Sequence, residues 1–280
     1  MDLRAICENV STHKHPVRYV VGLALLRARL NSLFRIKHAD FTIRFQPTAL
    51  SLALWVDPTY RSVDHDFFRG YLRPGDVAVD VGANIGSLTL TASSSVGTSG
   101  TVVSVEADPR TAAFLSRNCA ANRARNVQII PCAVGSSPGA VLLSRQSDDS
   151  TTFVSNDGGD VTVPMRTLDE VLAGVPGRIA LVKIDVEGYE LAVLVGASKT
   201  LARADCVYFE AWDFLCARYG YAVTDIVQLL GAAGFGVYRL GPGGTITPVP
   251  STFSASMLEN LVAIRDVDAY CARTSSSVAG

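Results

Sequence analysis

The chain has 280 residues, of which 48% are hydrophobic, so it is long enough to bury the core of one large α/β domain. Its net charge of −1 excludes an overall electrostatic field that would attract nucleic acid or an anionic membrane. The six cysteines show neither a C-x-x-C pair nor zinc-ligand spacing, which is typical of reduced core residues in a cytoplasmic protein.

Residues 17–34 are mostly apolar and carry several arginines, a pattern that predicts a helix. The longest uninterrupted apolar run, residues 19–26, is too short to span a bilayer, so no transmembrane segment is expected. Arg18 and Arg29 would share one helix face while Arg27 points the opposite way, which argues against a clean membrane-surface helix. We expect the helix to pack on the core or on a partner subunit in a homodimer. Contact with a lipid or an apolar substrate is the alternative.

Residues 41–56 alternate in the manner of two strands, with a break at Gln46-Pro47. A Pro74-Gly75 turn then leads into the first strand of the core. Residues 1–70 are therefore predicted to form an N-terminal extension, made of a helix and a β-hairpin, that caps the following domain.

From residue 71 to 267 the chain alternates strands and helices, which predicts an α/β fold with a mostly parallel sheet and helices on both faces. Strands are expected at 77–81, 101–106, 126–130, 178–185, 205–210, 234–240 and 260–264. Helices are expected at 86–96, 110–122 and 221–233. Short strands at 140–143, 151–154 and 161–165 predict a β-rich insertion between the third and fourth core strands. The final segment, 268–280, ends in a serine-rich stretch and is expected to be disordered.

The first core strand ends in an acid followed by a glycine turn, Asp80-Val81-Gly82-Ala83-Asn84-Ile85-Gly86, and the second strand ends in Glu106. Glycines permit a sharp turn, the helix start offers free N–H groups, and Glu106 can accept hydrogen bonds from ribose hydroxyls, so these ends predict a nucleoside site. A dinucleotide site requires a middle glycine in this turn, which is missing here. In addition, Asp80 would repel a diphosphate but attract an ammonium group. The pattern therefore favours S-adenosylmethionine over NAD.

Ligands of an open parallel sheet collect beyond the carboxyl ends of its strands, so Asp80, Glu106, Asp185 and Glu210 are expected at one edge. Asp185 lies where a transferred methyl group would meet its acceptor. Glu187 and Glu190 follow at a helix start, where charge–dipole and capping roles are the alternative to a catalytic one.

Several motifs occur in a fixed order along the chain. They are Arg73-Pro74-Gly75-Asp76, residues 79–86, Val105-Glu106-Ala107-Asp108-Pro109, Ala133-Val134-Gly135, residues 163–169, and Lys183-Ile184-Asp185-Val186-Glu187-Gly188-Tyr189-Glu190. In this order they resemble the FkbM-type family of S-adenosylmethionine-dependent methyltransferases over residues 60–265. The resemblance implies a seven-stranded class I methyltransferase (Rossmann-like) fold with a reversed last strand. Tyr189 stands where the family often has a small residue.

The resemblance also implies a cofactor-binding set. Glu106 would bind the ribose hydroxyls, and Asp108 with Ala133 would lie near the adenine. A loop with Ser150 and Thr151 is expected to reach the site. The complete set is Asp80, Gly82, Ala83, Asn84, Gly86, Glu106, Ala107, Asp108, Ala133 and Asp185.

Transfer of a methyl group to a hydroxyl requires that the acceptor lose its proton, for which the candidate bases are Asp185, Glu187, Glu210 and His65. Histidine has the most suitable pKa range, and the alternative for His65 is a solvated loop residue. Asp185 with Glu210 is also a candidate pair for a divalent metal ion, although a third oxygen ligand is not evident, so metal dependence is not favoured.

The sequence thus predicts an O-methyltransferase that uses S-adenosylmethionine, releases S-adenosylhomocysteine and acts on a small hydroxylated metabolite rather than on nucleic acid. The acceptor is expected to be a sugar, glycoside, glycolipid or polyketide-like product. The alternatives are an NAD-dependent oxidoreductase with a Rossmann fold and a non-catalytic, methyltransferase-like binding module.

Overall fold

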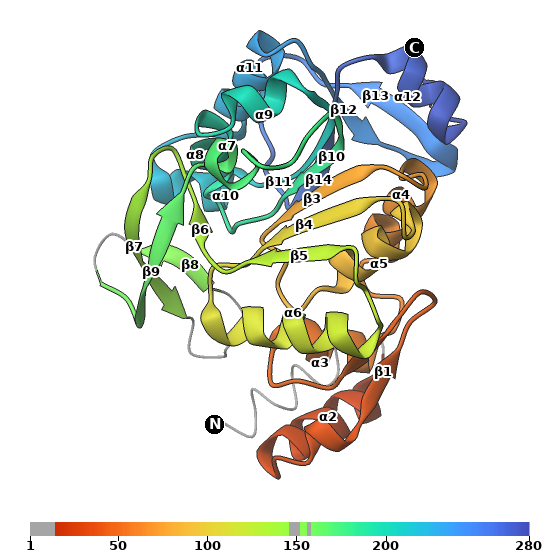
Figure 1. Cartoon of the computed structure of the whole chain (residues 1–280), viewed down its shortest axis with the longest axis vertical. Coiled ribbons are helices and arrows are strands. Elements are labelled where there is room, and N and C mark those ends of the chain that lie inside the picture. The colour runs from red at the N-terminus through yellow and green to blue at the C-terminus, as the bar shows by residue number, and fades with distance from the viewer. Residues whose placement is uncertain (1–14, 146–151, 156–157, 280) are drawn as a thin grey trace.

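A computed structural model describes residues 15–145, 152–155 and 158–279. Its centre is a nine-stranded sheet with the order β15-β13-β12-β14-β11-β10-β3-β4-β5 (Figure 1). The strands are β3 (Val77–Val81), β4 (Thr101–Val105), β5 (Val127–Ile130), β10 (Ile179–Ile184), β11 (Ala204–Ala211), β12 (Gly236–Leu240), β13 (Thr245–Pro248), β14 (Glu259–Ile264) and β15 (Ser277–Val278).

The sheet confirms the predicted mostly parallel α/β fold. Strands β5, β4, β3, β10 and β11 are parallel neighbours, and β14 runs antiparallel between β11 and β12. All seven expected strands are present, but β13 and β15 extend the same sheet, so the expected number of seven is too low. The reason is the turn at Pro242–Gly244, which folds β13 back onto β12 instead of ending the sheet.

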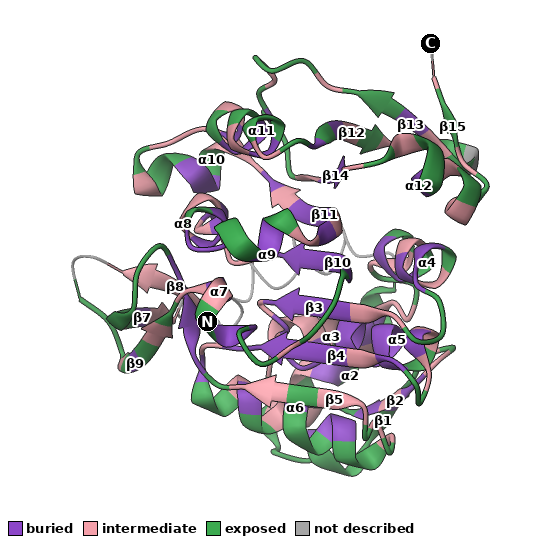
Figure 2. Ribbon diagram, turned by 45° about the horizontal axis from the view of Figure 1, so that its top comes forward, coloured by how far each residue is buried: buried purple, intermediate pink, exposed green. Residues whose placement is uncertain are grey.

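Neighbouring residues of each strand point to opposite faces of the sheet, and helices cover the apolar side chains on both faces. Ala78 and Leu181 pack toward α4 (Ser62–Tyr71), α5 (Ser87–Val96) and α12 (Val267–Thr274). Val79 and Val182 pack toward the opposite layer, which consists of α7 (Leu168–Val171), α8 (Glu190–Val195), α9 (Ser198–Ala202) and α11 (Val223–Ala232). Figure 2 shows the central strands buried between these layers. The cysteines Cys119, Cys132, Cys206 and Cys216 are free and buried in this core.

The final segment is ordered through residue 279, so the expectation of disorder from residue 268 is wrong for its described part. Asp266 caps α12 by accepting a hydrogen bond from the backbone N–H of Ala269. Tyr270 is buried and its ring stacks on that of Tyr71, with 5.5 Å between the ring centroids. Burial of this one aromatic side chain anchors a helix whose composition alone is weakly apolar.

The N-terminal module consists of α2 (Pro16–Arg27), the 3₁₀ turn η1 (Asn31–Leu33), β1 (Arg35–Lys37), β2 (Thr42–Arg44) and α3 (Ala49–Val56). The expected helix and hairpin are present, but the hairpin is β1–β2, and residues 49–56 form a helix instead of a strand. Leu and Ala are strong helix formers, and the side chain of Thr48 caps α3 by accepting from the N–H of Ser51, so local propensity outweighs the alternating pattern.

The module packs against α6 (Pro109–Ala121), where the side chain of Asn122 both donates to and accepts from the backbone of Thr42. All of helix α4 except its last residue falls within residues 1–70, yet Phe68 and Tyr71 belong to the core under the sheet.

The predicted β-rich insertion is a separate four-stranded sheet. Its strands are β6 (Ala133–Val134), β7 (Gly139–Arg145), β8 (Thr152–Ser155) and β9 (Val161–Arg166), in the order β6-β9-β7-β8. The insertion reaches η2 (Ala217–Tyr219), which follows α10 (Asp213–Cys216). The Tyr219 hydroxyl donates to the carbonyl of Val154, and the Arg218 guanidinium lies 4.1 Å from the centroid of the Phe153 ring. These contacts close one side of the space beyond the strand ends.

Candidate active site

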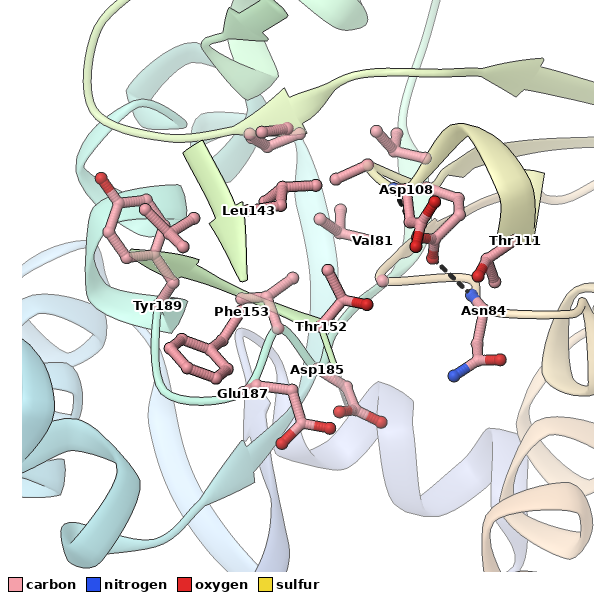
Figure 3. A pocket seen from close by; sticks show the side chains of 18 of the residues that line it. Val81, Asn84, Asp108, Thr111, Leu143, Thr152, Phe153, Asp185, Glu187 and Tyr189 are labelled. Carbon is pink, nitrogen blue, oxygen red and sulfur yellow. Dashed lines mark hydrogen bonds between the residues drawn. The ribbon is translucent and has the colours of Figure 1, made fainter. Parts of the chain in front are cut away.

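A central cavity lies beyond the carboxyl ends of β3, β4 and β10, between the insertion and the N-terminal module (Figure 3). We call it the central cavity and define it by the predicted residues that line it: Gly82, Asn84, Glu106, Ala107, Asp108, Ala133, Asp185 and Glu187. Other residues also line it, among them Pro47 and Thr48 from the N-terminal module and Leu143, Thr152 and Phe153 from the insertion. Ser150 and Thr151 lie outside the described residues.

The turn after β3 brings the first and second strand ends together. Gly82 has a φ of +76°, and a Cβ at this position would overlap the carbonyl oxygen of Asp185, so only glycine fits. The N–H of Asn84 then donates to Oε2 of Glu106 at 2.8 Å, the bond drawn in Figure 3. The carboxyl group of Glu106 is thereby held at the cavity wall.

Glu106 accepts a second backbone hydrogen bond at Oε1, from the N–H of Asp108 at 2.9 Å. Burial raises the pKa of Glu106 to about 7, while these two backbone donors oppose the rise. Each carboxylate oxygen has two lone-pair sites, so Glu106 retains acceptor capacity toward the cavity.

Three predicted cofactor residues do not line this cavity. The carboxylate of Asp80 is buried beneath it, where Thr89 Oγ1 donates to it at 2.6 Å and Lys183 Nζ lies 3.0 Å away. Ala83 packs into the apolar cluster between the core and the N-terminal module. A Cβ at Gly86 would overlap the buried side chain of Leu115, so this glycine permits α5 and α6 to pack closely.

The second strand end is braced by a charged pair that sequence reasoning did not identify. Asp108 caps α6 by accepting from the N–H of Arg110, and its carboxylate also accepts two hydrogen bonds from Arg145, at 2.8 and 2.9 Å. Burial alone would raise the pKa of Asp108, but the hydrogen bonds from Arg145 and Arg110 outweigh it and lower the pKa. Arg145 lies on β7, so this pair ties the insertion to the cavity wall.

Two further residues were missed by sequence reasoning, Lys183 and Arg61. Lys183 Nζ donates to the carbonyl of Gly82 at 2.8 Å and lies 3.7 Å from Oδ2 of Asp185. Arg61 donates to Asp185 at 2.8 Å and to Asp64 at 2.6 Å. A lysine inside the apolar run of β10 was a signal for Lys183, whereas Arg61 comes from a distant segment and gave none.

These residues form an alternating ionic chain, Asp64–Arg61–Asp185–Lys183–Asp80, under one end of the cavity. Burial disfavours the charged form of Asp185, but Lys183 and Arg61 outweigh that effect and lower its pKa. Asp185 is therefore held as a carboxylate whose charge is already compensated, which makes it a poor proton acceptor.

A side cavity adjoins the central one and contains the remaining predicted acids. It is lined by Tyr60, Arg61, Asp64, Asp185, Glu187, Glu210, Trp212, Phe214, Leu215, Arg218, Leu258 and Asn260. Arg61, Asp185 and Glu187 line both cavities and so form the wall between them. Figure 3 shows the carboxyl groups of Asp185 and Glu187 next to each other.

Glu187, which is part of that wall, and Glu210, which lines the side cavity alone, differ from Asp185 in charge state. Burial, together with the neighbouring Asp185 and Glu190, raises the pKa of Glu187 to about 7. Burial, together with Asp185 and Glu187, raises the pKa of Glu210 to about 9, and its Oε2 is a buried oxygen with no hydrogen-bond partner among the described residues. At neutral pH Glu187 is thus near its midpoint, and Glu210 carries a proton.

The turn that presents Glu187 is held by Glu190, the first residue of α8, which bonds the backbone of this turn and does not cap the helix. Glu187 has a φ of +58°, an uncommon conformation for a residue with a side chain. Oε1 of Glu190 accepts from the N–H groups of Val186 at 2.9 Å and Gly188 at 3.2 Å. These bonds offset the strain of the turn and fix the Glu187 side chain at the wall.

His65 is neither in a solvated loop nor at either cavity. It is completely buried in α4, with Nδ1 2.8 Å from Oγ1 of Thr91. Burial, together with His38 and Arg69, lowers the pKa of His65 to about 4. The structure therefore does not bring this predicted base to the acids of the site, because its side chain points into the packing of α4 on α5.

Across the described ranges, no group of three or more His, Cys, Asp or Glu side chains is arranged to hold a metal ion. Within the same ranges, the helices are too short or too polar to cross a bilayer.

The chain was compared with known proteins. Residues 80–237 match the family described as Methyltransferase FkbM domain, and no curated protein matches. Among solved structures, it is similar to the methyltransferase FkbM from Methylobacillus flagellatus KT, with 16% identity, a TM-score of 0.43, and 76% of this chain and 53% of that chain covered.

Two further solved structures show similar values. A SAM dependent methyltransferase from Aquifex aeolicus has 13% identity and a TM-score of 0.45, with 80% of this chain and 100% of that chain covered. Fibrillarin from Aeropyrum pernix, solved with bound S-adenosyl-L-methionine, has 14% identity and a TM-score of 0.44, with 74% and 76% covered. Since the family match spans more than half of the 280 residues and includes the acidic ends of both strands, Asp80 and Glu106, the chain belongs to the FkbM methyltransferase family, whose cofactor is S-adenosylmethionine.

Proposed function

We propose that the protein transfers the methyl group of S-adenosylmethionine to a hydroxyl oxygen of a small metabolite, of the sugar, glycoside, glycolipid or polyketide-like classes. The observation that carries the proposal is the wall shared by the two cavities, formed by Arg61, Asp185 and Glu187. A cofactor in the central cavity and an acceptor in the side cavity would meet at this wall.

The donor set of the central cavity fits this cofactor. Glu106 has free lone pairs for the ribose hydroxyls, and Gly82 and Asn84 would lie along the ribose and methionine part. Ala107, Asp108 and Ala133 would surround the adenine. Asp80 would act indirectly, because its ion pair with Lys183 lies under the cavity floor.

When bound, the cofactor supplies a methyl group that its positively charged sulfur has already activated, and it leaves as S-adenosylhomocysteine. The protein must align an acceptor oxygen about 3–3.5 Å from the methyl carbon and take up the hydroxyl proton. Glu187 fits the role of base, since its pKa of about 7 lies near neutral pH.

The other two acids fit different roles. Asp185 is compensated by Arg61 and Lys183, so it would orient the acceptor hydroxyl rather than deprotonate it. Glu210 is protonated at neutral pH and would donate a hydrogen bond to an acceptor oxygen. Trp212 and Tyr60 offer flat apolar surfaces for a ring-shaped acceptor.

The test is transfer of a labelled methyl group to a panel of hydroxylated and amine-bearing small molecules. Because the base must be ionised, kcat should rise with pH through about 7. In Glu187→Gln this rise should disappear and kcat should fall about 10²–10⁴-fold, with the affinity for S-adenosylhomocysteine nearly unchanged. Asp66→Asn, an exposed acid on α4, is the matched control.

Three results would contradict the proposal. Methyl transfer to amines but not to hydroxyls would show that the acceptor atom is nitrogen and not oxygen. No transfer to any acceptor, with the cofactor bound, would favour a non-catalytic binding module. Wild-type turnover and pH dependence in Glu187→Gln would remove Glu187 as the base. The absence of a nucleic-acid partner, inferred from net charge, stays a prediction that ribosomal RNA in the acceptor panel would test.

A further inference from the structure

Helix α2 is held to the rest of the protein by one face only. Gly22 is the buried residue of this helix, and a Cβ there would lie 2.7 Å from the Leu52 side chain and 2.9 Å from that of Trp55. Arg18 lies on the same side, with its guanidinium 5.8 Å from the centroid of the Trp55 ring. The inner face of α2 is thus packed on α3.

The outer side of the module exposes large apolar side chains. On α2, Val17 is 75% exposed, and Val20 and Val21 are 46% and 44% exposed. After the helix, Leu33 is 76% exposed. We define the outer apolar surface by Val17, Val20, Val21, Leu30, Leu33 and Phe34.

Trp55, which packs on the inner face of α2, also holds the segment that follows the helix. The Phe34 ring contacts the Trp55 ring edge-to-face, with centroids 5.7 Å apart. The indole N–H of Trp55 donates to the carbonyl of Arg18, in the first turn of α2, at 3.1 Å. The chain after α2 therefore folds back along the helix, and this module forms the end of the molecule opposite the C-terminus (Figure 1).

The same segment is strongly cationic. Residues 15–37 include Arg18, Arg27, Arg29, Arg35 and Lys37 but contain no Asp or Glu, although the whole chain carries a net charge of only −1. All five cations belong to exposed residues. The expected helix face shared by Arg18 and Arg29 does not exist, because α2 ends at Arg27 and Arg18 is turned onto Trp55. Arg27 does point away from Arg18, as expected, but Arg18 lies on the packed face and therefore does not interrupt the outer face of α2.

We propose that the outer apolar surface and its surrounding cations dock on an anionic lipid bilayer, with α2 lying along the membrane surface. Exposed valine and leucine side chains would enter the boundary between headgroups and acyl chains, and the arginines would pair with anionic headgroups. At 12 residues α2 is too short to span the bilayer. This docking is independent of the proposed methyl transfer.

The charge of this segment favours a bilayer over a second copy of the chain as the partner that covers the outer apolar surface. A two-fold symmetric homodimer through α2 would place this surface against itself and bring like charges together. Nucleic acid would satisfy the cations but would leave the apolar side chains without an apolar environment. An anionic bilayer provides both kinds of contact.

The test is co-sedimentation of the full chain with vesicles of phosphatidylcholine, with or without about one third phosphatidylglycerol. The protein should partition onto anionic vesicles and not onto neutral ones, and salt should weaken the binding. Arg27→Gln with Lys37→Gln should lower the partition coefficient about 25-fold, at about fivefold per cation. Lys199→Gln with Arg178→Gln removes two exposed cations far from α2 and should have no effect.

A second variant separates docking from simple charge attraction. Val17→Ser with Leu33→Ser should lower the partition coefficient about tenfold or more, since both side chains are three-quarters exposed in the free protein. S-adenosylhomocysteine binding by calorimetry checks that every variant is folded.

Several outcomes would overturn the proposal. These are no binding to any vesicles, equal binding to neutral and anionic vesicles, or binding that is weakened by Arg27→Gln with Lys37→Gln but not by Val17→Ser with Leu33→Ser. A soluble dimer that dissociates in the serine variant would show that a second copy covers the surface. Binding to RNA that survives in the serine variant, without vesicle binding, would assign the cations to nucleic acid.

Discussion

At the scale of single residues, Glu106 shows how a strand end becomes part of a binding site. Each of its carboxylate oxygens accepts one backbone N–H, and the group faces the central cavity. Glu106→Ala would remove the acceptor for ribose hydroxyls and leave the N–H groups of Asn84 and Asp108 unpaired. A hydrogen bond to a charged group contributes about 1.5–3 kcal/mol, so the Kd for S-adenosylhomocysteine should rise roughly 10–100-fold. Titration calorimetry measures this. An unchanged Kd would exclude the ribose role.

Arg61 is a positioning residue whose effect should appear in a pH profile. It is one of two cations that lower the pKa of Asp185. Arg61 also lowers the pKa of Glu187, so in Arg61→Gln that pKa should rise and the acidic limb of kcat should move to higher pH, with a smaller effect on cofactor affinity. Arg69→Gln breaks a comparable ion pair with Asp40, away from both cavities, and serves as the control. An unaltered acidic limb in Arg61→Gln would show that the charge of Arg61 does not influence the pKa of Glu187.

At the scale of elements, the junction between β3 and β10 determines the geometry of the site. Gly82 has a positive φ, and a side chain there would overlap the backbone of Asp185. Gly82→Ala should therefore separate the two strand ends, destabilise the protein by roughly 2–4 kcal/mol and weaken cofactor binding. Urea unfolding measures the first effect.

Gly70 provides the matched control for that substitution. It lies in α4, and an added Cβ would meet no atom within 4 Å. Gly70→Ala should stabilise the protein by about 0.5–1 kcal/mol, because alanine is the better helix former. If Gly82→Ala were equally harmless, the close approach of the two strands would not be required.

At the scale of the whole molecule, the buried acids of the site make stability depend on pH. Glu210 has a folded-state pKa of about 9, above the ordinary value of 4.5, so the folded state binds more protons than the unfolded state at neutral pH. Stability from this group is present at low pH and is lost as pH rises toward 9.

The cofactor-free protein should therefore lose on the order of 1–2 kcal/mol of unfolding free energy between about pH 7 and pH 8.5. Burial lowers the pKa of His65 to about 4, so the contribution of His65 to stability no longer changes with pH above about pH 7. Urea unfolding at the two pH values measures the loss, and Glu210→Gln should reduce it. A rise in stability over this window, or the same loss in Glu210→Gln, would contradict the assignment.

The sequence by itself determined the order of core strands and helices, the acid-ended strands and the family. These features depend on local patterns: residues that alternate toward two faces, glycines in tight turns, and caps such as Asp108 at the start of α6. Glu106, Asp185 and Glu210 were found in this way, because strand ends of a parallel sheet meet at one edge, and Glu187 was found at the helix start that follows.

Only the tertiary structure decided which of these acids are ionised and which predicted residues reach the cavities. Arg61 lies 124 residues from Asp185 in the chain, so their pairing leaves no local pattern. Asp80 and His65 have suitable chemistry, but packing buries both away from the cavities. A pKa and a cavity wall depend on neighbours that folding brings together, whereas a strand or a turn depends on neighbours along the chain.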